Sequence, residues 1–135
     1  ASPNYYALSF WAAQHTSPDS LFMIPPYGWS TYYLFRAYAQ RGVLLNGSIG
    51  EVVIADHDLG VRYYHVLADI APLYARQVDT ERFVRVAKKY QIDYIVTENQ
   101  STQSLNLPIA YQNQSYTIYT VPTSTTANYG YYLDR

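Results

Sequence analysis

The sequence predicts one α/β domain built on a mixed sheet, with about three parallel strands flanked by helices and a C-terminal antiparallel hairpin. Short unbroken apolar runs alternate with longer segments whose apolar residues recur at helical spacing, as in βαβ units. The chain has 135 residues, which fits a single hydrophobic core. We expect 1–121 to form this domain and 122–135 to be a polar tail that contains tyrosines.

The first helix is predicted over 3–15, because Ser2 and Pro3 form the pattern of an N-cap followed by proline at the first helical position. After a turn, the apolar run at 21–24 fits a strand that is buried on both faces. The two prolines that follow this run end the strand. The apolar face of the helix is predicted to hold Leu8, Trp11 and Ala12.

A second helix is predicted to begin at Ser30 or Thr31 and to end near Gln40, where Gly42 acts as a stop signal. The run at 43–45 is then a second strand. Strand, helix and strand in this order form a βαβ unit, so the two strands are expected to be parallel. The buried stripe of this helix is predicted to consist of Leu34, Phe35 and Tyr38.

Two further helices are predicted in the middle of the chain. Apolar residues recur at helical spacing from Leu59 until Pro72, which is expected to end the first of these helices. The second begins at Asp79 or Thr80 as its cap. It is expected to bury Phe83, Val86, Ala87 and Tyr90, and to expose Arg82, Arg85, Lys88 and Lys89 as a solvated face.

The C-terminal part of the domain is predicted to add three strands. The run at 92–97 is rich in β-branched and aromatic residues and follows the preceding helix closely, as a third parallel strand would. The runs at 108–111 and 116–121 flank a four-residue hairpin loop at 112–115. They are expected to form an antiparallel edge.

Composition excludes several classes of function. Charged residues make up 14% of the chain and the net charge is −1, so a nucleic-acid partner is not expected. The chain has no cysteine, which excludes disulfides and thiolate catalysis. No P-loop or GxGxxG pattern is present, and we predict no cofactor. The 17 tyrosines fit strand packing, a sugar-stacking or protein-docking face, or a belt at a membrane interface.

The loop at 25–30 is the predicted ligand site, because open α/β sheets bind ligands beyond the carboxyl ends of their strands. Tyr27 and Trp29 can stack on a sugar ring, while Arg36 and Arg41 can contact phosphate or carboxylate groups. Packing, turn formation and surface ion pairs account for the same residue types, so both interpretations stay open.

Two clusters of polar residues are weighed as chemical sites. Asp56, His57 and Asp58, with His65 further on, are of the types that ligate metals, but their spacing matches no metal motif and helix capping explains them. We predict no metal site. Glu51 with Asp56 can be read as a carboxylate pair for glycoside hydrolysis.

Three N-glycosylation patterns begin at Asn46, Asn99 and Asn113.

Three phrases of the sequence carry a resemblance to a known group of proteins. They are WAAQHTSPDSLFMIPP at 11–26, FRAYAQR at 35–41 and AKKYQIDYIV at 87–96. The chain resembles the soluble C-terminal domains that follow the transmembrane helices of polytopic bacterial membrane proteins, among them relatives of glycosyltransferases that use lipid-linked sugars. The Trp-Trp-Asp-Tyr-Gly motif of oligosaccharyltransferase catalytic subunits is replaced here by Pro25-Pro26-Tyr27-Gly28-Trp29.

The resemblance implies a domain on the periplasmic or extracellular side of a membrane, attached to transmembrane segments outside this sequence. We expect a noncatalytic domain that recognises a glycan or lipid-linked sugar, or that serves as a scaffold in a cell-envelope process. One alternative is a small carbohydrate-active enzyme that uses Asp or Glu. Another is a tyrosine-rich module that binds a protein partner.

Overall fold

The computed structural model describes residues 2–26, 35–44, 57–75 and 79–122. In this part of the chain one five-stranded mixed sheet has the strand order β2-β1-β3-β5-β4. The predicted mixed α/β class is therefore confirmed. The elements are α1 (Pro3–His15), β1 (Leu21–Met23), β2 (Gly42–Val43), α4 (His57–Ala75), α5 (Thr80–Lys89), β3 (Tyr94–Glu98), β4 (Ile109–Gln112) and β5 (Tyr116–Thr120).

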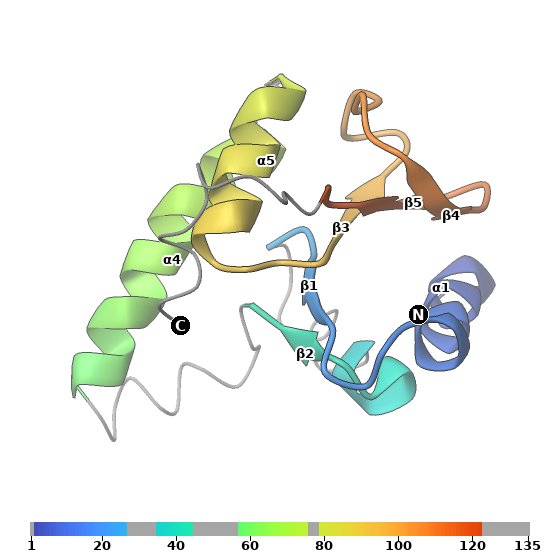
Figure 1. The fold of residues 1–135 in the computed structure, drawn as a ribbon, viewed down its shortest axis with the longest axis horizontal. Helices are drawn as coiled ribbons and strands as arrows, with labels where there is room; N and C mark the ends of the chain where they lie inside the picture. Colours follow the sequence, from blue (N-terminus) through green and yellow to red (C-terminus); the bar gives the residue numbers. More distant parts are fainter. Residues whose placement is uncertain (1, 27–34, 45–56, 76–78, 123–135) are drawn as a thin grey trace.

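The sheet has a parallel half and an antiparallel half. Strand β1 pairs in parallel with β2 and β3, while β5 pairs antiparallel with β3 and β4. Helices α4 and α5 lie side by side on the left of the sheet in Figure 1, and α1 lies on the right. Within the described ranges, no helix is both long and apolar enough to cross a bilayer.

Helix α1 has the predicted bounds and the predicted cap. The Ser2 side chain accepts a hydrogen bond from the Tyr5 backbone N–H at 3.3 Å, which satisfies an orphan donor of the first turn. The buried face includes Leu8 and Ala12, as expected. The Trp11 ring is partly buried and stacks on Tyr111 of β4, with ring centroids 5.4 Å apart. Helix α1 is thereby fixed against the antiparallel half of the sheet.

Strand β1 is buried on both faces, as its unbroken apolar run predicts. Phe22 and Met23 point to opposite faces because successive side chains alternate in a strand, and both are fully buried. Strand β2 follows a helical segment at 35–39 and pairs with β1 in parallel, which confirms the βαβ interpretation.

The second helix ends differently from the prediction. Gln40 adopts a left-handed conformation with φ of 54° and so terminates the helix, whereas Gly42 lies in strand β2. A Cβ atom on Gly42 would lie 3.0 Å from the Leu21 Cδ1, so a larger residue at this position would require the Leu21 side chain to shift. The predicted buried position of Tyr38 is also wrong: its side chain is 38% exposed, while Ala39 is fully buried beside Phe35.

Helix α4 continues past Pro72, where the sequence predicted its end. Pro72 cannot donate the intrahelical hydrogen bond to residue 68, a loss that with the steric clash costs about 3 kcal/mol. The three further residues include Leu73 and Tyr74, both almost fully buried, and each such burial contributes roughly 1.5–3 kcal/mol. The Tyr74 hydroxyl also donates to the Val96 carbonyl at 2.8 Å. Tertiary burial thus outweighs the local effect of the proline.

Helix α5 and strand β3 follow the predicted order. Asp79 is the N-cap of α5, because its side chain accepts from the Arg82 backbone N–H at 3.0 Å. Phe83 and Ala87 are fully buried. Gln91, with φ of 61°, then turns the chain into β3, which occupies 94–98 where 92–97 was predicted.

The C-terminal hairpin is present with a shorter loop than predicted. Gln112 belongs to β4, so three residues and not four connect the strands. The Asn113 side-chain oxygen accepts from the backbone N–H groups of Ser115 and Tyr116, both at 2.9 Å. This Asx-type turn begins at residue 113, one residue later than the predicted loop. Tyr116, Ile118 and Thr120 are alternate residues of β5 and therefore share one face, and they pair with Glu98, Val96 and Tyr94.

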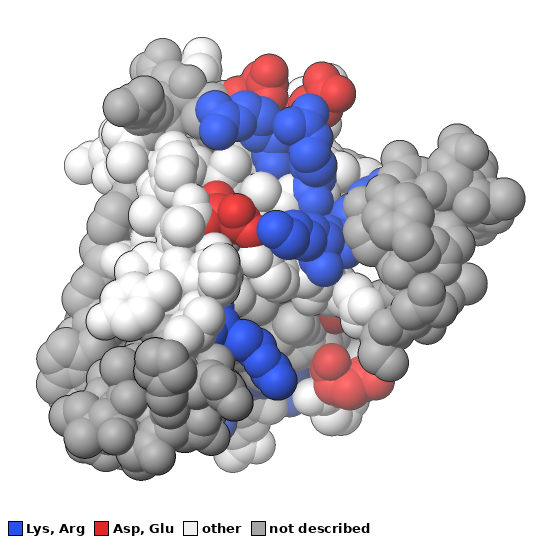
Figure 2. All heavy atoms as spheres, turned by 90° about the vertical axis from the view of Figure 1, so that its left-hand side faces the viewer, with Lys and Arg blue, Asp and Glu red and all other residues white. Residues whose placement is uncertain are grey.

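The exposed side of α4 and α5 carries charges of both signs. Figure 2 shows Lys and Arg side chains over this face with Asp and Glu among them. Asp69 of α4 accepts hydrogen bonds from Lys89 at 2.8 Å and from the Tyr90 hydroxyl at 2.5 Å. Arg85 and Glu81 form an ion pair at 3.7 Å. The face has the solvated character that the sequence predicted for α5.

The contact of Asp69 with Tyr90 predicts a pH-dependent stability. Partial burial opposes ionisation of Asp69, but the hydrogen bonds from Lys89 and Tyr90 outweigh it and lower the carboxyl pKa. Burial, then the bond to Asp69, raises the Tyr90 pKa. Because the carboxyl pKa is lowered on folding, Asp69 contributes stability at pH values above 3.8, the ordinary pKa of the carboxyl group. Because the phenol pKa is raised on folding, Tyr90 contributes stability at pH values below 10.0, the ordinary pKa of the phenol.

Tyr90→Phe is therefore expected to lower the free energy of unfolding by about 1 kcal/mol between these two pH values. The loss should shrink as the pH falls through the pKa of Asp69 in the folded chain. Urea unfolding of both proteins from pH 3 to pH 8 measures it. A difference that stays constant over this range would contradict the assigned contact.

Candidate functional site

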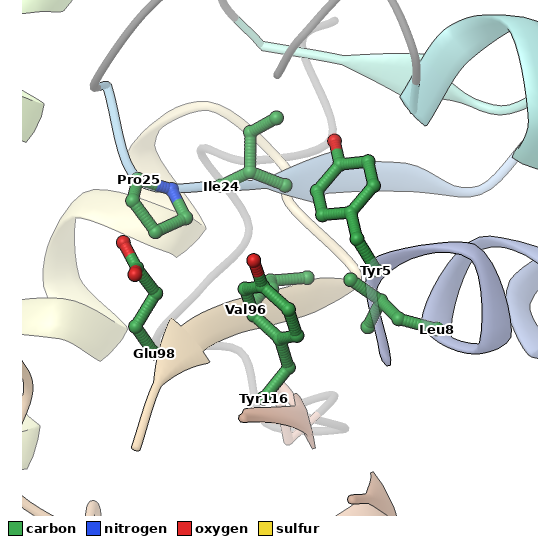
Figure 3. Close-up of a pocket in the computed structure, with 7 residues that line it drawn as sticks. All are labelled: Tyr5, Leu8, Ile24, Pro25, Val96, Glu98 and Tyr116. Carbon is green, nitrogen blue, oxygen red and sulfur yellow. The ribbon is translucent and has the colours of Figure 1, made fainter. Parts of the chain in front are cut away.

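A pocket lies at the carboxyl ends of the parallel strands β1 and β3. It has a volume of about 110 Å³ and lies between α1, the end of β1, β3 and β5. Ligands of open α/β sheets bind at this kind of edge. The residues that line it are Tyr5, Leu8, Ile24, Pro25, Val96, Glu98 and Tyr116 (Figure 3).

Two tyrosines form the aromatic wall of the pocket. Tyr5 is placed by the first turn of α1, which the Ser2 cap fixes. Tyr116 is placed by the register of β5 on β3, where it pairs with Glu98. The two rings meet edge to face, with centroids 5.6 Å apart and planes at 73°. In Figure 3 both hydroxyl groups and the Glu98 carboxylate point toward the same side of the pocket.

Both tyrosine hydroxyls are protonated at neutral pH, and burial raises their pKa values further above the ordinary 10.0. Burial is the largest cause that raises the Tyr5 pKa, and the neighbouring Tyr116 raises it further. Burial also raises the Tyr116 pKa, followed by the negative charge of Glu98, while a hydrogen bond with Ser2 acts in the opposite direction. Both groups therefore remain neutral donors and acceptors at neutral pH.

Apolar side chains make up the remainder of the lining. Leu8 comes from the buried face of α1, Ile24 and Pro25 from the end of β1, and Val96 from the middle of β3. All are buried in the structure. The pocket thus combines an apolar base, two aromatic rings, two hydroxyls and one carboxylate, which is the composition expected of a small-molecule site.

The residues that the sequence proposed as ligand contacts do not meet in this pocket. Tyr27 and Trp29 lie outside the described residues. Arg36 is exposed on the helical segment 35–39. Arg41 is 9% exposed, and its side chain is held between that segment and α1.

Arg41 is saturated with protein hydrogen bonds. Its Nε donates to the Thr16 Oγ1 at 2.9 Å, and its Nη2 donates to the carbonyls of Ala13 at 2.9 Å and Thr16 at 2.8 Å. Its Nη1 donates to the carbonyls of Ala39 at 3.3 Å and Gln40 at 3.0 Å. These five bonds use all five N–H groups of a guanidinium. We therefore assign Arg41 to capping two helix C-termini, in place of the ligand contact that the sequence indicated.

The other sequence candidates do not gather into a site. Glu51 and Asp56 lie outside the described residues. In the described ranges, no three His, Cys, Asp or Glu side chains are placed to hold one metal ion. Two of the three glycosylation-pattern asparagines are used within the fold: the Asn99 amide donates to the Asn113 carbonyl at 2.8 Å, and the Asn113 amide donates to the Asn4 carbonyl at 2.9 Å. Asn46 lies outside the described residues.

A separate group of aromatic rings is exposed beside α1. Phe10 is 50% exposed and Tyr38 is 38% exposed. The Tyr38 ring makes edge contacts with Tyr6 and Phe10, with centroids 4.9 and 5.9 Å apart. None of these three residues lines the pocket. This exposed aromatic group therefore offers control positions for experiments on the pocket.

Sequence reasoning missed the pocket residues Tyr5, Glu98 and Tyr116. Glu98 follows directly after the predicted strand at 92–97, and a polar residue at that place was the available signal. The sequence carried no such signal for Tyr5 and Tyr116, because their contact joins the first and last elements of the domain.

No family model, curated protein or solved structure matches the chain. The function is therefore argued from the pocket.

Proposed function

We propose that this chain is a noncatalytic domain that recognises a glycan through the pocket formed by Tyr5, Glu98 and Tyr116. The observation that carries the proposal is the pairing of aromatic rings with a carboxylate at the carboxyl edge of the parallel strands. Sugars present apolar C–H surfaces together with hydroxyl groups. Tyrosine rings match the apolar surfaces, while the tyrosine hydroxyls and a carboxylate match the hydroxyl groups.

The lining of the pocket favours recognition over hydrolysis. Glycoside hydrolysis normally requires two carboxyl groups, one as acid and one as nucleophile or base. Of the described residues that line the pocket, Glu98 supplies one carboxylate and no second Asp or Glu accompanies it. The small carbohydrate-active enzyme is therefore the less supported alternative.

We further propose that the domain belongs to a membrane protein and faces the periplasm or the extracellular space. The support is the resemblance of the phrases at 11–26, 35–41 and 87–96 to the soluble domains of polytopic membrane proteins. In the fold these phrases supply the end of α1 with β1, the helical segment before β2, and the passage from α5 to β3. An upstream reading frame that encodes several apolar spans would support this placement, and a frame without any would contradict it.

Tyr116→Ala is expected to weaken sugar binding at least about tenfold, which corresponds to about 1.4 kcal/mol, because it removes one aromatic wall and one hydroxyl. The measurement is a titration of the chain with mono- and oligosaccharides, followed by NMR shifts or calorimetry. Tyr111→Ala is the matched control: Tyr111 lies on the adjacent strand, is also partly buried and packs on Trp11, but does not line the pocket. Equal losses in both variants would contradict a binding role for Tyr116.

Two further outcomes decide between the alternatives. Loss of binding in Phe10→Ala, with Tyr116→Ala unaffected, would move recognition to the exposed aromatic group beside α1. Release of reducing sugar from a glycoside panel would contradict the noncatalytic assignment. Absence of binding to every sugar would contradict glycan recognition itself.

A further inference from the structure

The charge of the pocket narrows the class of sugar that it can accept. Among the described residues that line the pocket, Glu98 is the one charged side chain, because the other six are apolar or tyrosine. Glu98 forms no ion pair with any residue in the described ranges. An anionic group in the pocket would be repelled by the Glu98 carboxylate at short range, which is unfavourable where water is partly excluded. A cationic group would meet a counter-ion.

The tyrosine rings favour the same sign of charge. The face of an aromatic ring attracts a cation that lies within about 6 Å of its centroid. The Tyr5 and Tyr116 planes meet at 73°, so the two rings form a corner, and a group placed in it lies over the face of at least one ring. Both hydroxyls are uncharged at neutral pH, because an ordinary pKa of 10.0 is raised further in each, so neither adds a negative charge to the pocket; the Tyr5 hydroxyl is hydrogen-bonded to the Phe35 backbone and the Tyr116 hydroxyl to the Ser2 side chain.

The volume limits how much of a sugar can enter. An apolar cavity of about 150 Å³ holds one benzene molecule, so a hollow of about 110 Å³ takes part of a sugar and not a whole pyranose ring with its hydroxyl groups. The remainder of the sugar would lie outside the hollow.

We propose that the pocket binds the ammonium-bearing end of an amino sugar, with Glu98 as the counter-ion and Tyr5 and Tyr116 as the aromatic corner. This inference rests on the proposed glycan recognition and specifies its ligand class. Under this proposal, neither the phosphate of a sugar phosphate nor the carboxylate of a uronic acid enters the pocket.

The test compares four probes on the intact chain at pH 6: glucosamine, N-acetylglucosamine, glucose and methylammonium. Glucosamine is expected to bind at least about tenfold more tightly than N-acetylglucosamine or glucose. Glu98→Gln should abolish this preference and leave the melting temperature unchanged, because the amide has the same shape without the charge. Glu81→Gln is the matched control, since it changes the net charge equally at an exposed position on α5.

Each result has a separate meaning. Equal binding of glucosamine, N-acetylglucosamine and glucose would overturn the ammonium assignment while glycan recognition stands. Binding of methylammonium alone, lost in Glu98→Gln, would support the cation site and overturn glycan recognition. A glucosamine preference that survives in Glu98→Gln or disappears in Glu81→Gln would overturn the role of Glu98. Absence of binding by all four probes would overturn both proposals.

Discussion

Replacement of Arg41 by alanine is expected to lower the free energy of unfolding by roughly 3–4 kcal/mol, a large part of the 5–15 kcal/mol typical of a domain. Its guanidinium donates to four carbonyls and one hydroxyl at the ends of two helices. Removing it leaves acceptors without partners in a buried place and takes a positive charge from the negative ends of two helix dipoles.

Two variants separate this structural role from a simple loss of charge. Arg41→Lys keeps the charge but has three donors in place of five, so it should be destabilised by roughly half as much. Arg36→Ala removes an exposed arginine from the same helical segment and should change stability by less than about 0.5 kcal/mol. Urea unfolding followed by circular dichroism measures all three variants. Similar losses for Arg36→Ala and Arg41→Ala would refute the capping role.

The Arg41 contacts illustrate where sequence reasoning stops. The termini of both helices were predicted within a few residues, since capping and turn signals are local. The contact between these two termini was not predicted, because it depends on how residues near 13–16 pack against residues near 39–41 in three dimensions. An arginine directly after a helix is consistent with a surface position, a ligand contact or a cap, and the sequence offers no way to distinguish them.

The errors in the elements have the same origin. Pro72 was expected to end a helix because its local cost is large, but the burial of Leu73 and Tyr74 outweighs it. Gly42 was expected to end a helix, whereas it pairs with Leu21 as part of strand β2 and Gln40 ends the helix. Both residues were interpreted by local rules at positions where a tertiary contact decides the structure.

The sheet was predictable to a greater extent, because its inner strands are marked by their own runs of apolar or β-branched residues. The unbroken apolar run at 21–24 and the β-branched run at 92–97 indicated buried parallel strands, and β1 and β3 are neighbours in the structure. The pocket at their carboxyl ends was not predictable in detail. Its aromatic corner joins Tyr5 to Tyr116 across 111 positions of sequence, and the register of β5 on β3 that brings them together is set by the whole fold.

Phe22→Ala is expected to lower the free energy of unfolding by about 3–5 kcal/mol, the range observed when a buried phenylalanine is truncated. Phe22 is fully buried in β1, which has strands on both sides. The centroid of its ring lies 5.0 Å from that of Phe35 and 4.9 Å from that of Tyr94, on which it stacks. Phe22 therefore joins the βαβ unit to β3. The cavity left by alanine would therefore lie between β1, β3 and the helical segment at 35–39.

The matched control for Phe22→Ala is Phe10→Ala, which removes the same atoms from a side chain that is 50% exposed. It should cost less than about 1 kcal/mol, because the surface it loses was already half in contact with water. Phe22→Leu should cost less than Phe22→Ala, since leucine fills part of the cavity. If Phe22→Ala and Phe10→Ala were equally stable in urea, β1 would not be a buried inner strand between β2 and β3, and the pocket at its carboxyl end would lose its basis.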